Sequence, residues 1–219
     1  MKGNCIMKKT LIVSGGNVEE NILNQIKGSF DYIIASDRGL EALDKNNIIP
    51  NYIIGDFDSI DKKILNKYIN NKDIEIKSLN PEKDYTDTHM ALKLAIELKS
   101  IEITIIGAVG TRLDHTIANI HILKETLDNN IECKIIDSRN EIQLINKKTI
   151  LKLDDNYKYI SLIPLTTEVK GLTLKGFKYS LQDATLEIGH SIGVSNEQIK
   201  EIAQIEFEKG ILILIKSRD

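Results

Sequence analysis

The first part of the chain alternates between short apolar runs and segments with helical periodicity. Residues 10–13 form one such run, which ends in a Ser-Gly-Gly turn and is followed by Val18, Ile22 and Ile26 at helical spacing. Further runs of this kind occupy residues 32–35, 52–54, 74–76, 101–106 and 133–136. The succession of strand, polar turn and helix occurs five times. It predicts an α/β fold in which a mostly parallel, doubly wound sheet carries helices on both faces.

After about Asp137 the pattern changes to short alternating runs with turn residues between them. These runs cover residues 141–145, 149–153, 157–163, 169–174, 184–188, 202–207 and 211–215. Strands at this spacing, without long helical segments, favour an antiparallel sandwich or barrel. Residues 208–210, Glu-Lys-Gly, indicate a hairpin that pairs the last two strands. We therefore expect two domains, residues 1–140 and residues 141–219, of which the second is smaller and all-β.

Charge and composition exclude several classes of partner. The net charge is −3, and acidic and basic residues are interspersed, which argues against nucleic acid and against binding to a membrane surface. No apolar run approaches the roughly 20 residues of a membrane span, and the first residues lack the apolar core of a secretory signal. Cys5 and Cys133 have no metal-type spacing, which is typical of reduced thiols. We expect a soluble cytosolic protein.

Two aspartates, Asp56 and Asp58, follow the apolar run 52–54 and Gly55. Side chains alternate along a strand, so the two carboxylates point the same way if extended geometry continues into the turn. Two like charges side by side favour a cation or proton chemistry. A polar Asx turn explains the same stretch equally well when the stretch is considered alone.

The positions of other polar clusters favour the hypothesis that Asp56 and Asp58 bind a cation. Residues 14–16, Asp37, residues 83–87 and residues 107–115 all follow predicted strands. In open α/β sheets, ligands bind at the carboxyl ends of the strands. We therefore expect these clusters and the two aspartates to share one edge of the sheet.

The segment 81–89 places one lysine and two aspartates ahead of a predicted helix. Asp84, Thr86 and Asp87 are ordinary helix-capping residues, and capping is the more common role of such a pattern. The functional interpretation is that Asp84 and Asp87 face the same cation as Asp56 and Asp58, while Lys83 faces phosphate. Such hard oxygen ligands suit Mg²⁺, which shares itself with substrate phosphates.

The segment 107–119 has the pattern Gly-x-x-Gly-x-Arg-x-Asp-His-x-x-x-Asn. The glycines allow backbone amides to approach an anion at a helix N-terminus, and Arg112 can bind a phosphate with two hydrogen bonds. The alternative is a plain turn with a surface ion pair between Arg112 and Asp114. His115 could orient a carboxylate or contact a nucleotide, although a lone histidine more often has a structural role.

Several well-known motifs are absent. The sequence contains no Walker-type phosphate loop, no Gly-x-Gly-x-x-Gly fingerprint and no Gly-x-Ser-x-Gly nucleophile elbow. Carboxylates with a divalent ion remain as the predicted chemistry. In the β-rich part, Ser195 and Asn196 are most simply explained as a polar loop between strands.

Taken together, these motifs resemble those of the thiamine pyrophosphokinase family. The resemblance depends on residues 36–39, 55–59, 83–87, 107–119 and 195–197, and it extends in the right order from about Leu11 to Ile215. It implies an α/β catalytic domain that binds ATP and Mg²⁺, followed by a thiamine-binding β-sandwich. It also implies a homodimer with the active site at the subunit interface. The implied reaction transfers a pyrophosphoryl group from ATP to the thiamine hydroxyl and releases AMP.

The resemblance also implies roles for individual residues. The Mg²⁺ ligands would be Asp56, Asp58 and Asp87, with Asp37 nearby, and Thr86 would help to hold the phosphates. The ATP site would further include Lys83, Arg112, Asp114, His115 and Asn119. Thiamine would meet Ser195 and Asn196, from the partner subunit. Either Asp84 or Asp87 could accept the proton of the thiamine hydroxyl, and the sequence does not choose between them.

Four residues depart from the family pattern. Arg38 replaces a common glycine, Val109 and Thr111 replace threonine and glycine, and His89 replaces a glutamate. None of these changes affects the aspartates. Two other functions use the same residues: a metal-dependent phosphohydrolase with water as the nucleophile, and a non-catalytic sensor of nucleotide or thiamine.

Overall fold

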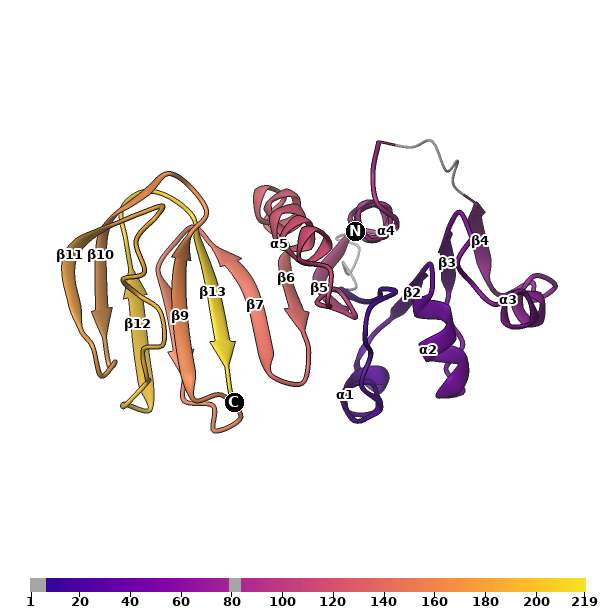
Figure 1. Cartoon of the computed structure of the whole chain (residues 1–219), viewed down its shortest axis with the longest axis horizontal. Coiled ribbons are helices and arrows are strands. Elements are labelled where there is room, and N and C mark those ends of the chain that lie inside the picture. The colour runs from indigo at the N-terminus through magenta and orange to yellow at the C-terminus, as the bar shows by residue number, and fades with distance from the viewer. Residues whose placement is uncertain (1–6, 79–83) are drawn as a thin grey trace, which may run out of the picture. The chain divides into compact units, whose positions relative to one another are not determined.

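A computed structural model describes residues 7–78 and 84–219 of the chain. The chain forms two compact units, Met1–Ser138 and Arg139–Asp219 (Figure 1). The first combines helices with parallel strands, and the second consists of antiparallel strands. This arrangement confirms the predicted fold class. The assignment of residues 1–140 to ATP and of residues 141–219 to thiamine stays a prediction.

The first unit is built on parallel strands in the order β4-β3-β2-β1-β5-β6. Every strand pair in this series is parallel. The strands are β1 (Lys8–Val13), β2 (Tyr32–Ser36), β3 (Tyr52–Gly55), β4 (Glu75–Ser78), β5 (Ser100–Ile106) and β6 (Glu132–Ile136). The order reverses at β1, which pairs with β2 on one side and with β5 on the other. That reversal creates a topological switch point between β1 and β5.

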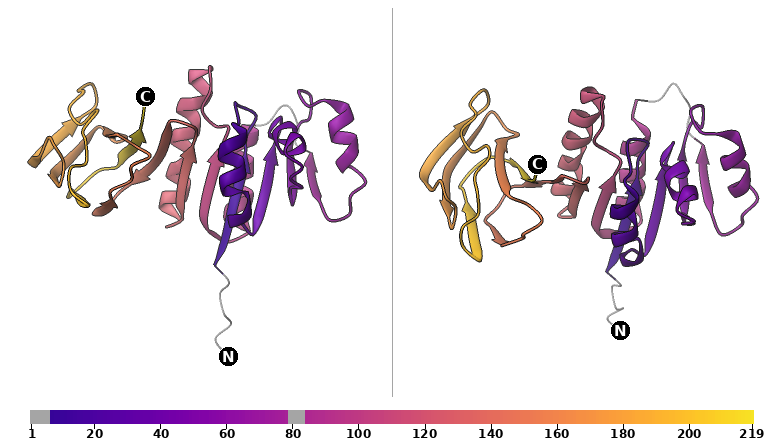
Figure 2. Two further views of the ribbon diagram at one scale, coloured as in Figure 1. Left: turned by 90° about the horizontal axis from the view of Figure 1, so that it is seen from below. Right: turned by 60° about the horizontal axis from the view of Figure 1, so that its bottom comes forward.

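Helices cover both faces of these strands (Figures 1 and 2). They are α1 (Glu20–Ile26), α2 (Gly39–Lys45), α3 (Lys62–Tyr68), α4 (Asp87–Glu97) and α5 (Leu113–Asp128), with a short 3₁₀ helix η1 (Lys27–Ser29) after α1. Leu11 and Val13 of β1 pack into one core with Leu23 of α1 and Leu40 of α2. Helix α4 contacts β1, β2, β3 and β5 on the opposite face, and α5 contacts β6 and α4.

The second unit contains two antiparallel layers of strands. One layer has the order β7-β13-β9 and the other has the order β11-β10-β12-β8. The strands are β7 (Asn140–Ile145), β8 (Thr149–Lys152), β9 (Tyr159–Pro164), β10 (Glu168–Lys175), β11 (Leu181–Glu187), β12 (Ile202–Glu206) and β13 (Leu212–Ser217). Leu162 and Leu214 of the first layer share a core with Leu172 and Ile205 of the second. The unit is therefore a sandwich.

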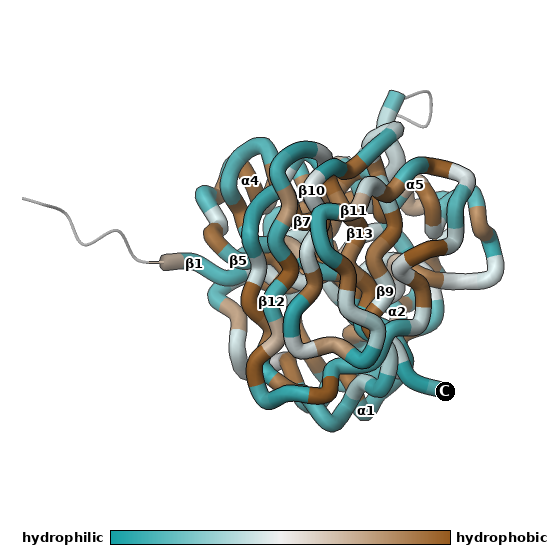
Figure 3. Tube along the Cα trace, turned by 90° about the vertical axis from the view of Figure 1, so that its left-hand side faces the viewer, coloured by the Kyte–Doolittle hydropathy of each residue, from teal (hydrophilic) through white to brown (hydrophobic). Residues whose placement is uncertain are grey.

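Alternating hydropathy within this sandwich follows the pleat of the strands. In β10, Val169, Leu172 and Leu174 are buried, whereas Lys170 and Lys175 are exposed. The strand register shifts between Val169 and Leu172, so both side chains reach the core although they are three residues apart. Figure 3 shows the corresponding change of hydropathy along the tube in the second unit. Because neighbouring side chains of a strand point to opposite faces, one face enters the core and the other meets solvent.

The predicted hairpin at residues 208–210 is wrong. Strand β12 pairs with β10 and β8, whereas β13 pairs with β7 and β9, so the last two strands belong to different layers. Between them, the Glu208 amide donates to the Lys170 carbonyl, and the Lys170 amide donates to the Lys209 carbonyl. The segment thus crosses between layers instead of turning back, and Gly210 supplies the positive φ of 111° that the crossing requires.

Within residues 7–78 and 84–219, no helix is both long enough and apolar enough to cross a membrane.

Asp44 joins α2 to α3 and provides a pH-dependent contribution to stability. Its two carboxylate oxygens accept from Lys67 Nζ at 2.7 Å and from the Tyr68 hydroxyl at 2.9 Å. The hydrogen bond from Lys67 lowers the pKa of Asp44, burial opposes this effect, and Tyr68 adds to the lowering. A carboxyl group whose pKa is lower in the folded state stabilises the protein above its unfolded pKa of about 4, and this stabilisation is lost as pH falls through the folded value.

We therefore expect Asp44→Asn to lower the free energy of unfolding at pH 7 by on the order of 1 kcal/mol. The deficit should shrink at pH 3, where the wild-type carboxyl group is increasingly protonated. Urea unfolding at both pH values measures the effect. Asp128→Asn is the matched control because Asp128 pairs with Lys124 on the surface of α5, and it should change stability little. Equal deficits for Asp44→Asn at both pH values would contradict the assignment.

Candidate active site

A cavity of about 370 Å³ lies in the first unit at the carboxyl ends of the parallel strands. Its lining includes the loops that follow β1 and β5, where the strand order reverses, together with the first residues of α4 and α5. The lining residues are Ser14, Gly15, Gly16, Ser36, Asp37, Arg38, Thr86, Asp87, Thr88, Gly107, Ala108, Val109, Gly110, Thr111, Arg112, His115, Thr116 and Asn119. The cavity therefore occupies the position at which doubly wound sheets bind ligands.

Close backbone contact between the two loops explains two of the glycines. The Gly16 amide donates to the Gly107 carbonyl at 2.9 Å, and a Cβ atom on Gly16 would lie only 2.4 Å from that oxygen. Gly107 itself has a φ of 69°, in the region that favours glycine. A Cβ atom on Gly110 would have no neighbouring atom within 4 Å. The first two glycines thus set the shape of the cavity wall, whereas Gly110 is not required for packing.

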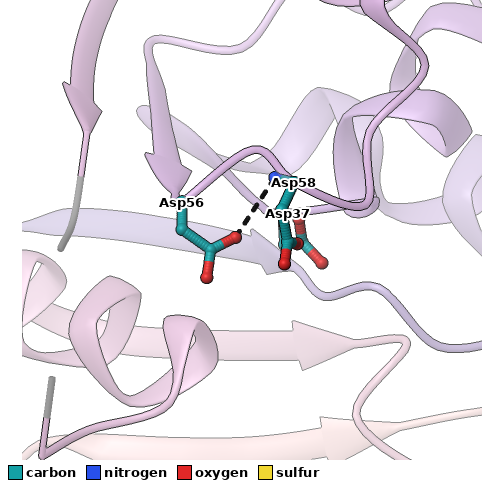
Figure 4. Close-up of side chains that lie close together, drawn as sticks. All are labelled: Asp37, Asp56 and Asp58. Atoms are coloured by element: carbon teal, nitrogen blue, oxygen red, sulfur yellow. Dashed lines mark hydrogen bonds between the residues drawn. The ribbon is translucent and has the colours of Figure 1, made fainter. Parts of the chain in front are cut away.

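Three carboxylates lie together beside this edge of the sheet (Figure 4). Asp37 follows β2, and Asp56 and Asp58 follow β3; each offers a ligand atom, and these atoms all lie within 4.8 Å of one another. The Asp58 amide donates to Asp56 Oδ1 at 3.3 Å, which is the Asx geometry proposed as the alternative for this stretch. The turn and the carboxylate cluster therefore coexist, because the turn brings Asp58 alongside Asp56.

The electrostatics of this cluster suit a cation. The hydrogen bond with Asp56 and then the charge of Asp56 raise the pKa of Asp58, and the charges of Asp37 and Asp87 act in the same direction. Ser59 Oγ donates to Asp37 Oδ2 at 2.6 Å, whereas the buried Asp37 Oδ1 has no hydrogen-bond partner among the described residues. A buried carboxylate oxygen without a donor, beside two further carboxylates, is an oxygen donor set that fits a hard divalent cation such as Mg²⁺.

The start of α4 brings Asp87 to the cavity. Of the carboxylate cluster, Asp37 lines the cavity as well, whereas Asp56 and Asp58 lie outside its lining. Thr86 caps the helix, and its Oγ1 accepts from the His89 amide at 3.3 Å. Asp87 is the first residue of the helix and lines the cavity. Asp84 is exposed and is not a lining residue. Lys83 lies outside the described residues. The two interpretations of this segment are therefore both correct for the start of α4: Thr86 caps the helix, and Asp87 lines the cavity.

The start of α5 contains the predicted ion pair. Arg112 and Asp114 lie 2.6 Å apart on the surface, where Arg112 lowers the pKa of Asp114 through a hydrogen bond. Arg112 and His115 line the cavity, whereas Asp114 does not. Asn119 is buried, and its Nδ2 donates to the Ala108 carbonyl at 2.8 Å. Asn119 therefore holds the loop after β5 in place, and Asp114 orients Arg112.

Comparison with known proteins identifies the relatives of this chain. Residues 23–135 match the family model of the thiamin pyrophosphokinase catalytic domain, and residues 147–212 match that of the thiamin pyrophosphokinase vitamin B1 binding domain. A thiamine pyrophosphokinase of Bacillus subtilis is 36% identical over 217 residues, which cover 97% of this chain and 100% of that protein. The chain belongs to the thiamine pyrophosphokinase family.

Solved structures of the family have the same fold. A crystal structure of thiamine pyrophosphokinase from Bacillus subtilis superposes with a TM-score of 0.87 at 35% identity, covering 97% of this chain and 100% of the other. A thiamin pyrophosphokinase from Geobacillus thermodenitrificans gives a TM-score of 0.86 at 30% identity, with coverage of 96% and 98%. Both matches extend over the parallel unit and the sandwich.

One departure from the thiamine pyrophosphokinase pattern forms a contact between helices. His89 Nε2 of α4 lies 2.8 Å from Glu125 Oε2 of α5, and Lys93 donates to the other oxygen of Glu125 at 3.1 Å. Burial alone would raise the pKa of Glu125, but the hydrogen bonds from His89 and Lys93 lower it. His89 thus links the two helices whose first turns line the cavity. The sequence pattern alone assigns His89 no role.

The predicted thiamine residues lie in the vitamin B1 binding part of the thiamine pyrophosphokinase match. Asn196 is buried; its amide nitrogen donates to the Tyr179 carbonyl at 2.7 Å, and its oxygen accepts from the Tyr179 amide at 3.0 Å. Ser195 is exposed and has a φ of 57°. Asn196 therefore stabilises the loop, as the simpler alternative proposed, and contact with thiamine stays a prediction for both residues.

Three hydroxyl residues of the cavity, Ser36, Thr88 and Thr116, are given no individual role by the sequence pattern. Ser36 ends β2, and Thr88 and Thr116 lie in the first turns of α4 and α5, so each is hidden within an ordinary element. The strand-end position that singles out Asp37 applies to Ser36 as well, whereas Ser14, the residue after β1, belongs to the segment 14–16 that the sequence places at this edge. Such residues become distinguishable only when the strand neighbours are known.

Gly16 and Gly110 differ in the space around them, and this difference tests the close contact between the loops after β1 and β5. We expect Gly16→Ala to lower the free energy of unfolding by about 1–3 kcal/mol, because the new methyl group overlaps the Gly107 carbonyl. Gly110→Ala is the control and should change stability little, because nothing lies within 4 Å of the new atom. Urea unfolding of both variants measures the difference. Equal losses in the two variants would rule out the close loop contact.

Proposed function

We infer that this chain is a thiamine pyrophosphokinase, which makes thiamine diphosphate from thiamine and ATP. The single observation that carries this conclusion is the likeness over nearly the full length to a thiamine pyrophosphokinase, which includes both domains of the family. The cavity at the switch point, with its carboxylates, glycine-rich loops and arginines, is consistent with binding of a nucleotide and a divalent ion.

In finer detail, we propose that the reaction transfers the pyrophosphoryl group to the thiamine hydroxyl and releases AMP. Such transfers require in-line placement of the reacting atoms and neutralisation of charge more than covalent help from the protein. Asp37, Asp56 and Asp58 would hold Mg²⁺, with Asp87 as a further candidate. When bound, Mg²⁺ supplies positive charge against the phosphate oxygens.

The remaining positive charge would come from the protein. Arg112 lines the cavity while Asp114 binds its guanidinium group, so Arg112 presents a fixed cation to a phosphate. Arg38, which departs from the family pattern, lines the same cavity and adds a second cation. The loop that Asn119 fastens, residues 107–111, would direct backbone amides to a phosphate, apart from the Gly110 amide, which donates to Thr116 Oγ1. Lys83 remains a hypothesis as a phosphate ligand.

Burial and position favour one of the two candidate bases. Asp87 lines the cavity, whereas Asp84 is exposed outside its lining. A general base must come within hydrogen-bond reach of the proton that it accepts. We therefore propose Asp87 as the acceptor of the hydroxyl proton. Three further proposals depend on the family resemblance. Ser195 and Asn196 bind thiamine, the chain forms a homodimer with its active site at the subunit interface, and the protein is cytoplasmic.

One assay separates the proposed transferase from the two alternatives. The protein is incubated with ATP, Mg²⁺ and thiamine, and products are separated by chromatography. AMP together with thiamine diphosphate is the expected result. Free phosphate that forms without thiamine would indicate a phosphohydrolase, and binding without turnover would indicate a sensor.

Variants of the aspartates test the site itself. We expect Asp58→Ala and Asp87→Ala each to lower turnover by at least about 100-fold while the protein still folds, because each removes a carboxylate that would hold Mg²⁺ or accept the hydroxyl proton. Asp128→Ala is the control, since Asp128 lies on the surface at the end of α5. Circular dichroism verifies folding. Near-native activity in either site variant would contradict the proposed roles.

A further inference from the structure

Ser36 carries a hydroxyl group whose role the proposed mechanism does not explain. It ends β2, is only 1% exposed and lines the cavity. Its Oγ is buried and has no hydrogen-bond partner among the described residues. Buried polar groups are nearly always hydrogen-bonded, because an unsatisfied one destabilises the folded state. An orphaned hydroxyl on a cavity wall therefore indicates a partner that arrives with a ligand.

The neighbours of Ser36 define the face to which it belongs. Ala35 packs into the core with α1 and α2, so the alternation of the strand turns Ser36 to the opposite face, which α4 covers. In the register of β1 and β2, Val13 pairs with Ala35, so Ser14 and Ser36 are the next residues along the two neighbouring strands. Both serines line the cavity.

Ser14, which also lines the cavity, provides a second hydroxyl proton that can be donated to a ligand. Thr88 Oγ1 of α4 donates to Ser14 Oγ at 3.0 Å. Because Ser14 accepts this bond, its own proton remains to be donated elsewhere. Arg38 and Arg112 line the same cavity and add positive charge. Hydroxyl donors combined with guanidinium groups are complementary to an anionic oxygen acceptor.

We propose that Ser36 is a substrate-contacting residue whose hydroxyl donates a hydrogen bond to a phosphate oxygen of the bound nucleotide. The proposal depends on the proposed function, which supplies the nucleotide. A phosphate is favoured over the nucleoside because Ser36 directly precedes Asp37 of the carboxylate cluster. Carboxylates that bind Mg²⁺ typically share the ion with substrate phosphates.

Ser36→Ala tests this contact because stability and binding should respond in opposite directions. Removal of an unpaired buried hydroxyl should leave the melting temperature of the ligand-free protein unchanged or raise it by about 2–4 °C. The same change should weaken binding of Mg·ATP about tenfold, measured by isothermal titration calorimetry. A serine with a purely structural role would instead lower the melting temperature, and that result would overturn the proposal.

Ser100→Ala provides a matched control. Ser100 is also a buried strand serine, but it begins β5, at the opposite ends of the parallel strands, and its Oγ lies 2.6 Å from Thr10 Oγ1. This variant should lower the melting temperature, because it leaves the Thr10 hydroxyl without its partner, and should leave the affinity for Mg·ATP unchanged. Equal effects of the two variants on affinity would overturn the proposal.

The choice of ligand identifies the part of the nucleotide that is contacted. Magnesium tripolyphosphate should lose affinity in Ser36→Ala by the same factor as Mg·ATP, since it contains the phosphates alone. Weaker binding of ATP without weaker binding of tripolyphosphate would contradict the phosphate assignment. If wild-type protein binds and converts ATP while Ser36→Ala does so with unchanged affinity, this inference fails and the proposed function stands. If wild-type protein does not bind ATP, both fail.

Discussion

Helices α1 and α5 follow neighbouring strands but cover opposite faces of the parallel unit, so the loops after β1 and β5 separate above the strand ends. The space between these loops is the cavity. One close contact limits how far they part, namely the Gly16 amide against the Gly107 carbonyl. The rest of the site depends on this arrangement, because it directs backbone amides, hydroxyl groups and the first turns of α4 and α5 toward one volume.

The carboxylates of Asp37, Asp56 and Asp58 lie within 4.8 Å of one another and repel one another, and hydrogen bonds within the chain accommodate them. The Asp58 amide donates a hydrogen bond to the Asp56 carboxylate, and the Ser59 hydroxyl donates one to the Asp37 carboxylate. These local hydrogen bonds offset part of the repulsion between the carboxylates. Asp37 nevertheless keeps one buried oxygen without a partner among the described residues, as does Ser36. Such unsatisfied groups cost stability, and a bound cation and its phosphates are the partners that would relieve them.

Much of the fold was predictable because hydrophobic periodicity is local. The alternation of strands and helices predicted the parallel unit, and short alternating runs predicted the sandwich. The hairpin at residues 208–210 was not predictable, since Glu-Lys-Gly suits either a tight turn or a crossing between layers. Backbone hydrogen bonds with Lys170 of β10, nearly 40 residues away, decide that Glu208 and Lys209 cross between the layers. Likewise, the partner of His89 lies 36 residues further along the chain.

The sequence by itself determined that Asp56, Asp58 and Asp87 follow strands or begin helices at one edge of a sheet, because strand direction fixes where each loop emerges. It also supplied the motifs that resemble the thiamine pyrophosphokinase family. Only the tertiary structure decided that Asp37 joins Asp56 and Asp58, that Asp87 lines the cavity while Asp84 does not, and that Asn196 serves its own loop. It alone placed Ser36 and Ser14 in the lining of one cavity. These facts depend on strand register and helix packing, which bring together residues that no local pattern connects.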